Sequence, residues 1–488
     1  MTSLKAQTTK GLFWSFLDSF GVYLIKFCFS IVIARTLSPG DYGVMGMIII
    51  FISLGQLLSE GGFAMALVQK KEAAAADYST VFWFNVIAGI IIYAILFFSA
   101  GAIADFFRTP QLTGVTRVAA LVIVINALVT VQSVQLARRM EFRKQAVINL
   151  FAALFSGTTG ILLALKGFGV WALVFQTVAG SVVNLAGLWL TSRWRPAAVF
   201  DRRSFRSLAG YGYKIFLQGL GDVVFTKIYF PLIGRFFPVD QLGYYSNSNR
   251  FYDLFVRQVS SSVNRVIFPA FSSIQEEKER FAANYTRSFG MLAFVMSLAM
   301  LVLIISTAQF VEIFLGTKWM PAVPLMIVFF IEGFYFPLLM LNQNLLSALG
   351  LSGKALETDI IKKSLTFISI LITFKYGIKA LIIGQVISTF AAFILSSAAI
   401  MKQLGLSPGS LLRSLYPVLL MVAVCFLADD MIIDRFISSR PLLLIVKITL
   451  VPAIYLAAGH FLKIPAFTEL KRMIAGGSAG SSTPQENG

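Results

Sequence analysis

Two stretches of this sequence decide its fold, because the second repeats the first. Residues 20–43 read FGVYLIKFCFSIVIARTLSPGDYG, and residues 220–243 read LGDVVFTKIYFPLIGRFFPVDQLG. Further matches follow in the same order along the chain, at offsets of 207, 211 and 208. This common order indicates a chain that is built twice. The pairs that match at an offset of 200 are Gly21 and Gly221, Arg35 and Arg235, and Gly43 and Gly243.

The composition is that of an integral membrane protein. Of the 488 residues, 57% are hydrophobic and 13% are charged, and the mean hydropathy is +0.79. A soluble domain carries roughly 25% charged residues, about twice as many. Since many transporters are built from internal repeats, a doubled chain this apolar is typical of a transporter.

Fourteen apolar runs are long enough to cross a membrane, which takes about 20 residues. The seventh and eighth are polar, but the repeat assigns them to the places of the first and second. The expected spans are 12–34, 42–64, 80–103, 115–136, 146–165, 169–191, 209–233, 242–269, 287–308, 321–348, 357–376, 379–401, 411–430 and 441–461.

Loop charge predicts the orientation of the chain. With an inside N-terminus, the cytoplasmic loops hold 24 Lys and Arg residues and the opposite loops at most ten. This bias places both termini in the cytoplasm. It also accounts for the net charge of +18, which in a soluble protein would suggest nucleic acid, so no nucleic acid partner is expected.

We therefore expect an all-α polytopic membrane protein. Each copy of the repeat has six helices and returns the chain to its starting side, so the two copies run parallel around a central cavity, with two helices added at the C-terminal end. The expected parts are a six-helix lobe at 1–192, a basic cytoplasmic linker at 193–208, a second six-helix lobe at 209–402, two extra helices at 403–465 and a disordered cytoplasmic tail at 466–488.

Charged side chains inside the predicted spans are the candidate functional residues. Each costs about 3 kcal/mol or more at mid-bilayer, so such residues usually face an aqueous cavity. In span eight, one helical stripe holds Arg250, Asp253, Arg257, Ser261 and Asn264, at steps of 3, 4, 4 and 3. Asp253 can pair with either arginine. These arginines suit recognition of an anion, although charges that only pair and lock the two lobes together would give the same pattern.

The first two spans of each copy carry the other charges that are expected to face the cavity. Lys447 in span fourteen has no evident partner. The remaining cations are Lys26, Lys214, Lys227 and Arg265. The acids, which serve ion coupling or charge balance, are Asp18, Glu60, Asp222 and Asp253.

Catalytic and metal-binding patterns are absent from the sequence. A single histidine, His460, and two cysteines in apolar runs exclude the usual clustered metal ligands. We therefore predict a transporter without cofactors, and not an enzyme.

Several motifs resemble those of bacterial polysaccharide flippases, over residues 10 to about 410. The closest resemblance is to the O-antigen and colanic-acid exporters, in the superfamily that also contains multidrug extruders and peptidoglycan-precursor flippases. The motifs are KGLFWS at 10–15, IARTLSPGDYG at 33–43, GGFAMALVQ at 61–69, LGYY at 242–245 and VIFPA at 266–270.

This resemblance implies a substrate and a place in the cell. The substrate would be an oligosaccharide repeat unit on undecaprenyl diphosphate. It would cross the bacterial inner membrane by alternating access, driven by a proton or sodium gradient, and a polysaccharide polymerase and glycosyltransferases would be partners. From the residues themselves, the cations expected to bind the pyrophosphate, mostly on the second copy, are Lys26, Lys214, Lys227, Arg250, Arg257 and Arg265. The residues expected to bind the sugar are Gln218, Asn247, Asn249, Ser261 and Asn264.

Three alternatives stay open at this point. A multidrug extruder for cationic drugs calls for a cavity of acids and aromatics, whereas this chain has more internal bases than acids. A peptidoglycan lipid-precursor flippase carries an equally anionic substrate. A membrane glycosyltransferase or polymerase would need large outer loops with acidic or histidine residues, and the loops here are short.

Overall fold

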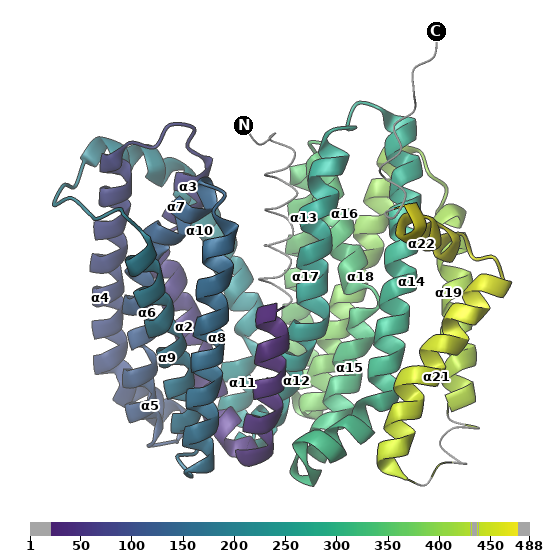
Figure 1. Cartoon of the computed structure of the whole chain (residues 1–488), viewed down its shortest axis with the longest axis horizontal. Coiled ribbons are helices and arrows are strands. Elements are labelled where there is room, and N and C mark those ends of the chain that lie inside the picture. The colour runs from purple at the N-terminus through teal and green to yellow at the C-terminus, as the bar shows by residue number, and fades with distance from the viewer. Residues whose placement is uncertain (1–20, 430, 432–436, 438, 477–488) are drawn as a thin grey trace. The chain divides into compact units, whose positions relative to one another are not determined.

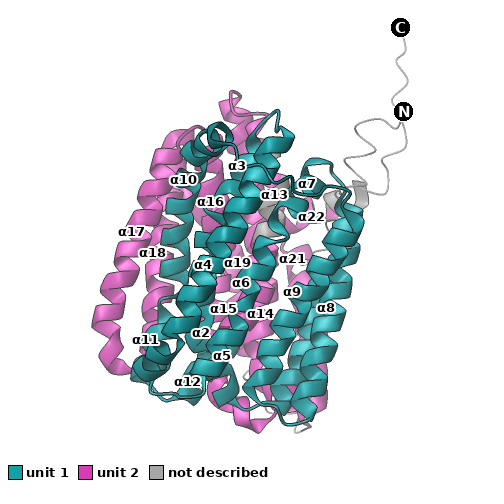
Figure 2. Cartoon of the chain, turned by 90° about the vertical axis from the view of Figure 1, so that its left-hand side faces the viewer, with its two compact units in different colours: residues 1–247 teal, residues 248–488 magenta. Residues whose placement is uncertain are grey.

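The computed structural model describes residues 21–429, 431, 437 and 439–476, except for the side chains of 261–266, 269, 408 and 472–476. Every regular element in the described residues is a helix (Figure 1). The chain divides into two compact units, residues 1–247 and 248–488 (Figure 2). The expected all-α architecture is confirmed.

Unit 1 begins, in the described residues, with a helix at 21–36. It continues with α2 (Pro39–Glu60), α3 (Phe63–Gln69), α4 (Ala75–Phe107), α5 (Leu112–Ala119), α6 (Leu121–Ala127), α7 (Thr130–Arg138), α8 (Phe142–Leu165), α9 (Val170–Thr191), α10 (Arg202–Lys227), α11 (Tyr229–Phe236) and the start of α12 (Val239–Tyr252).

Unit 2 takes up the end of α12 and continues with a π-helical turn, η1 (Asp253–Arg257). The elements that follow are α13 (Gln258–Ser272), α14 (Lys278–Phe310), η2 (Val311–Leu315), η3 (Thr317–Ala322), α15 (Val323–Gly333), α16 (Phe336–Ala348), α17 (Ser352–Thr373), η4 (Phe374–Tyr376), α18 (Ile378–Leu404), α19 (Pro408–Ala428), α21 (Arg440–Phe461) and α22 (Pro465–Gly476).

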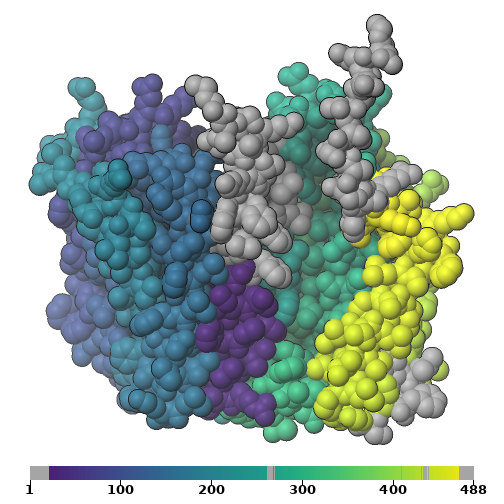
Figure 3. Space-filling view, in the orientation of Figure 1, coloured from purple at the N-terminus to yellow at the C-terminus, as the bar shows by residue number. Residues whose placement is uncertain are grey.

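Each predicted span overlaps a helix. In the described residues, 11 helices are long and apolar enough to cross a membrane. The helix at 21–36, the α12–α13 segment and α17 fall outside these 11. Large apolar side chains are exposed along the spans, for example Leu442, Ile445 and Ile448 of α21, whose surface is yellow in Figure 3. Such a surface fits lipid and not water, so the chain is a multi-pass membrane protein.

The two repeated glycines mark the place where α2 and α12 cross, within unit 1. A Cβ atom on Gly43 would lie 2.1 Å from the carbonyl oxygen of Val239, and one on Gly243 would lie 1.8 Å from that of Pro39. The two contacts are reciprocal, because Pro39 and Val239 occupy equivalent places in the repeat. Only glycine permits both backbones to approach so closely.

The basic segment after α9 is tied to the start of α4. The backbone N–H of Ala197 donates to Ser79 Oγ at 3.1 Å, and its carbonyl accepts from Trp83 Nε1 at 2.8 Å. Asp201 N donates to Thr80 Oγ1 at 3.0 Å. The division at residue 247 also places α10 and α11 in unit 1, although the repeat aligns them with the first span. The lobe boundaries predicted from the repeat stay a prediction.

The predicted disordered tail is wrong for residues 466–476. They belong to α22, which packs on α14, and an ion pair between Arg287 and Glu469 joins the two helices. Ala466 is buried, and Phe467 and Leu470 pack beside it on the cluster that α14, α19 and α21 share. The apolar face of α22 is therefore buried against the protein. Residues 477–488 lie outside the described residues.

Candidate functional site

The centre of the candidate site is an ion pair on the π-helical turn that follows α12. Arg257 Nε lies 2.9 Å from Asp253 Oδ1, and both side chains are partly exposed. Asn249 Nδ2 donates to the other carboxylate oxygen of Asp253 at 3.1 Å. The structure thus joins Asp253 to Arg257, one of the two arginines that the sequence left open as its partner.

The π-helical turn has a geometric role in this pairing. Single π-helical turns inside α-helices are rare and occur often at functional sites. Here the turn spans Asp253–Arg257 and so includes both members of the ion pair. A wider turn changes the direction in which the following side chains point, and Arg257 is the last residue of that turn.

Aromatic rings form one wall of the site. The guanidinium carbon of Arg257 lies 5.6 Å from the ring centroid of Tyr252 and 5.7 Å from that of Phe336. Lys362 Nζ from α17 lies 5.6 Å from the same Phe336 ring. Cations within about 6 Å of a ring face are attracted by its quadrupole. The rings therefore hold two cations from different helices near one another.

A buried acid faces these cations. Glu332 of α15 is 2% exposed and accepts a hydrogen bond from Gln385 Nε2 at 3.3 Å. Its carboxylate interacts electrostatically with Lys362 and Arg257. A carboxylate buried inside a membrane span is costly unless cations and hydrogen bonds offset its charge, and both are present here.

The arrangement can bind an anion. A guanidinium group carries five N–H donors in a planar fork, and an arginine keeps its charge when it is desolvated. Lys362 adds a second positive charge. The two acids, Asp253 and Glu332, balance the charge of the two cations, and a phosphate would compete with the acids for these cations.

The structure brings together three of the residues that the sequence proposes for this site: Asn249, Asp253 and Arg257. Arg250 is half-buried on α12. The side chains of Ser261, Asn264 and Arg265 and the whole of Asp18 lie outside the described residues.

The other candidates lie in unit 1, where α10 carries a polar stripe. Lys214, Gln218 and Asp222 are all exposed along one face of this helix, at the predicted spacing of four. Lys227 Nζ lies 5.4 Å from the ring centroid of Phe230. An exposed polar stripe on a spanning helix is expected to face water or protein and not lipid.

The remaining unit 1 candidates differ in exposure. Lys26 is exposed and lies 6.0 Å from the ring centroid of Tyr23. Asn247 is 1% exposed. Glu60 is half-buried and is the last residue of α2.

Sequence reasoning missed several residues of the site. Tyr252, Phe336 and Gln385 carry no charge and stand among many similar residues, so no pattern distinguishes them. Lys362 lies inside the expected span 357–376 and inside α17, but it was not proposed as a site residue. The apolar run FISILIT at 367–373, which follows Lys362 closely, indicated that this lysine lies within a membrane span.

Among the described residues, no three His, Cys, Asp or Glu side chains gather closely enough to hold a metal ion. The fold and the site together are typical of a multi-pass membrane transporter, with a polar site in which two cations and two acids gather.

Comparison with known proteins identifies the family. A family model described as "Polysaccharide biosynthesis protein" matches residues 32–324, so the chain belongs to this family. The succinoglycan biosynthesis transport protein ExoT of Rhizobium meliloti is 28% identical over 57% of this chain and 56% of that relative, just over half of its length. The teichuronic acid biosynthesis protein TuaB of Bacillus subtilis is 24% identical over 74% of this chain and 75% of its own.

Solved structures show the fold of the superfamily. The lipid II flippase MurJ in an inward closed conformation matches with a TM-score of 0.75 and 14% identity, over 92% of this chain and 98% of that one. Multidrug transporters of the MOP superfamily share the fold as well. The chain therefore belongs to the polysaccharide biosynthesis family and has the fold of these MOP-superfamily transporters.

Proposed function

We propose that this protein moves an oligosaccharide repeat unit, carried on undecaprenyl diphosphate, from the cytoplasmic to the periplasmic leaflet of the bacterial inner membrane. The observation that carries the proposal is Arg257, a partly exposed cation within a predicted membrane span, which shares the Phe336 ring with a second cation, Lys362. A diphosphate matches two such cations in charge and in donor geometry. The polysaccharide biosynthesis family supports a carbohydrate cargo.

The proposed cycle is alternating access driven by an ion gradient, with both chain termini in the cytoplasm. Asp253 serves charge balance, because Arg257 and Asn249 hold both of its carboxylate oxygens. Glu332 is the proposed coupling group. Its protonation removes a negative charge that competes for Arg257 and Lys362, so the uptake of a proton favours the binding of an anionic substrate.

The peptidoglycan lipid precursor is the alternative that the fold leaves open, since MurJ shares the fold at low identity. The family match favours a polysaccharide repeat unit. A multidrug role for cationic compounds fits poorly with a site whose exposed ion pair presents an arginine. A polysaccharide polymerase and glycosyltransferases would then act on the product and supply the substrate.

The first test uses the site cation in a bacterium that lacks its own polysaccharide flippase. Arg257→Ala is expected to lower surface polysaccharide at least tenfold, because losing one partner of a desolvated phosphate contact costs about 2 kcal/mol or more. Arg257→Lys keeps the charge and is expected to keep part of the output.

The matched control is Arg280→Ala. Arg280 also pairs with an acid close in sequence, Glu277, but it is exposed at the start of α14. Membrane levels of every variant are measured by immunoblot. Wild-type polysaccharide output from Arg257→Ala at normal protein level would reject the proposed site.

A further inference from the structure

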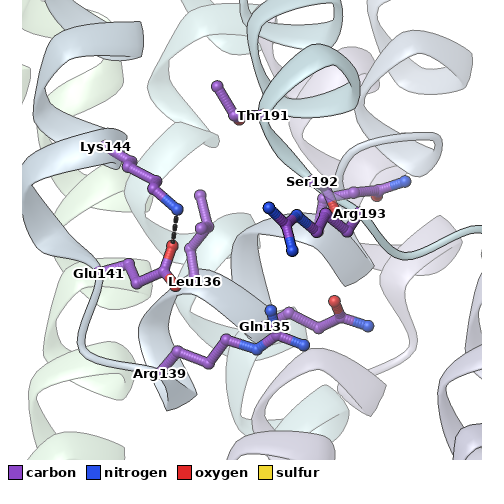
Figure 4. A pocket seen from close by; sticks show the side chains of 9 residues that line it. Gln135, Leu136, Arg139, Glu141, Lys144, Thr191, Ser192 and Arg193 are labelled. Atoms are coloured by element: carbon purple, nitrogen blue, oxygen red, sulfur yellow. Dashed lines mark ion pairs between the residues drawn. The ribbon is translucent and has the colours of Figure 1, made fainter.

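A second polar site lies in unit 1, at the ends of three helices. It is a pocket of about 200 Å³ in which the end of α7, the start of α8 and the end of α9 meet (Figure 4). It shares no residue with the candidate transport site. Its lining residues are Gln132, Gln135, Leu136, Arg139, Glu141, Lys144, Thr191, Ser192 and Arg193.

The charge of the pocket is positive. Three cations line it and one acid, and that acid, Glu141, is already bound by Lys144 at 2.6 Å. Arg139 and Arg193 form no ion pair with any described residue, and Figure 4 shows both side chains extending toward the pocket. Two arginines at one small pocket, whose charges no described acid neutralises, attract an anion.

Two neighbouring arginines, Arg138 and Arg195, bind backbone carbonyl oxygens and do not line the pocket. Arg138 donates hydrogen bonds to the carbonyl oxygens of Leu67, Lys70 and Lys71, at the end of α3. Arg195 likewise binds backbone carbonyls of its own segment, including that of Ser192 at 2.7 Å. These two guanidinium groups satisfy helix ends. Arg139 and Arg193 are left to the pocket.

The wall of the pocket contains a buried amide. Gln135 is 6% exposed, and its side-chain amide makes no hydrogen bond with the described residues. An amide at the wall of a small pocket can donate its N–H₂ group to an oxygen atom of a ligand, so a ligand with oxygen acceptors suits this position. The Ser192 hydroxyl, which accepts a hydrogen bond from the backbone N–H of Trp194, is a further donor to such an oxygen.

An apolar stripe continues from the pocket along α8. Val147, Phe151 and Phe155 follow Lys144 at helical spacing on the same face, and their side chains are 39%, 64% and 57% exposed. A soluble phosphate has no apolar part that could contact this stripe, whereas the hydrocarbon chain of a lipid would cover it. The pocket also lies at the ends of membrane spans, where phosphate headgroups are found.

We propose that this pocket binds the phosphate or diphosphate headgroup of a membrane lipid, with the hydrocarbon chain lying along α8. Arg139 and Arg193 bind the phosphate oxygens, and Gln135 donates a hydrogen bond to one of them. The loop-charge bias assigns this side of the membrane to the cytoplasm. Both an anionic glycerophospholipid and a polyprenyl diphosphate have this chemistry. The inference does not rest on the transport activity proposed above.

The test is native mass spectrometry of the purified full-length protein with added lipid. Phosphatidylglycerol, a polyprenyl diphosphate and the uncharged polyprenol are compared, with inorganic pyrophosphate as a soluble competitor. Arg139→Gln with Arg193→Gln is expected to weaken the binding of one phosphate lipid roughly tenfold or more, since each arginine near a headgroup contributes about 1 kcal/mol. Whichever phosphate lipid depends on the two arginines identifies the source.

The matched control is Arg202→Gln with Arg206→Gln, which removes the same charge from exposed positions of α10. Gln135→Leu is a second pocket variant that leaves the net charge unchanged, and it is expected to weaken the same binding. Equal loss in the pocket and control variants, or binding of pyrophosphate without either phosphate lipid, would overturn the proposal. So would unchanged binding in both pocket variants at wild-type melting temperature.

Discussion

At the scale of single residues, each buried charge in the described spans has a specific partner. Lys447 is the clearest case. Its Nζ lies 3.0 Å from Asp429 Oδ2 and donates to the carbonyl oxygen of Ile305 at 3.0 Å, and the residue is 2% exposed. The sequence offered no partner, because Asp429 ends the preceding apolar run and the pairing depends on how α19, α14 and α21 pack. The ion pair joins these three helices.

Lys447→Met is expected to destabilise the protein by about 3–5 kcal/mol, because it leaves the buried Asp429 without its cation. The measurement is thermal unfolding of purified protein in detergent. Adding Asp429→Leu is expected to restore much of the loss, since both charges are then gone. Lys402→Met, at an exposed position of α18, is the control. A single variant as stable as the wild type would show that the pair has no structural role.

The proposed coupling role of Glu332 can be separated from that of Asp253. Glu332→Gln imitates the protonated carboxyl, so transport by this variant is expected to lose its dependence on external pH. Asp253→Asn is expected to keep that dependence, because Asp253 serves charge balance. Lipid flipping in proteoliposomes between pH 6 and 8, roughly the range of physiological proton coupling, is the measurement. A wild-type pH profile in Glu332→Gln would remove this residue as the coupling group.

At the scale of elements, the crossing of α2 and α12 depends on two positions of the repeat. Gly43 and Gly243 each face a backbone carbonyl oxygen that no Cβ atom could approach. The repeated pattern in the sequence thus reflects a reciprocal contact, in which each copy supplies one glycine and one carbonyl.

Gly43→Ala and Gly243→Ala are each expected to cost about 1–3 kcal/mol, because the backbones must separate to admit a methyl group. Gly101→Ala in α4 is the control, since no atom lies within 4 Å of its added Cβ. Melting temperatures of the three variants are compared. Two crossing variants as stable as Gly101→Ala would mean that α2 and α12 do not pack as described.

The start of α10 has a pH-sensitive cap. Asp201 accepts hydrogen bonds from the Ser204 hydroxyl at 2.7 Å and from the backbone N–H groups of Ser204 and Arg203. These hydrogen bonds lower the pKa of Asp201 from its ordinary 3.8, and the bond from the Ser204 hydroxyl has the largest effect. The carboxylate therefore stabilises the first turn of α10 at any pH above the pKa that Asp201 has in the unfolded chain. This stabilisation is lost as the pH falls through the lower pKa that Asp201 has in the folded protein.

The expected result is a loss of amide protection in the first turn of α10 as the pH drops below about 4. Hydrogen exchange, corrected for the intrinsic rate, measures it. Asp201→Asn is expected to show weaker protection at neutral pH and no such transition. Identical pH profiles in the two proteins would rule out the cap as the source.

At the scale of the whole molecule, the resemblance of short motifs was sufficient to predict the family, and the repeat and the apolar runs were sufficient to predict the helices. The repeat and the apolar runs act over single helices, where hydropathy and spacing decide the outcome. The site was predicted only in part. Arg257 and Asp253 follow from spacing on one helix, whereas Lys362, Glu332 and Phe336 join them through packing of separate helices. The end of the chain was mispredicted because α22 buries its apolar face on α14.

The most direct test of the account is flipping by the purified protein. Undecaprenyl-diphosphate-linked oligosaccharide is placed in liposomes, and its transfer between leaflets is followed by access of a sugar-modifying enzyme added outside. The account predicts transfer by the wild type and Arg280→Ala, and at least tenfold slower transfer by Arg257→Ala. Failure of the wild type to transfer this lipid, or equal transfer by Arg257→Ala, would contradict it.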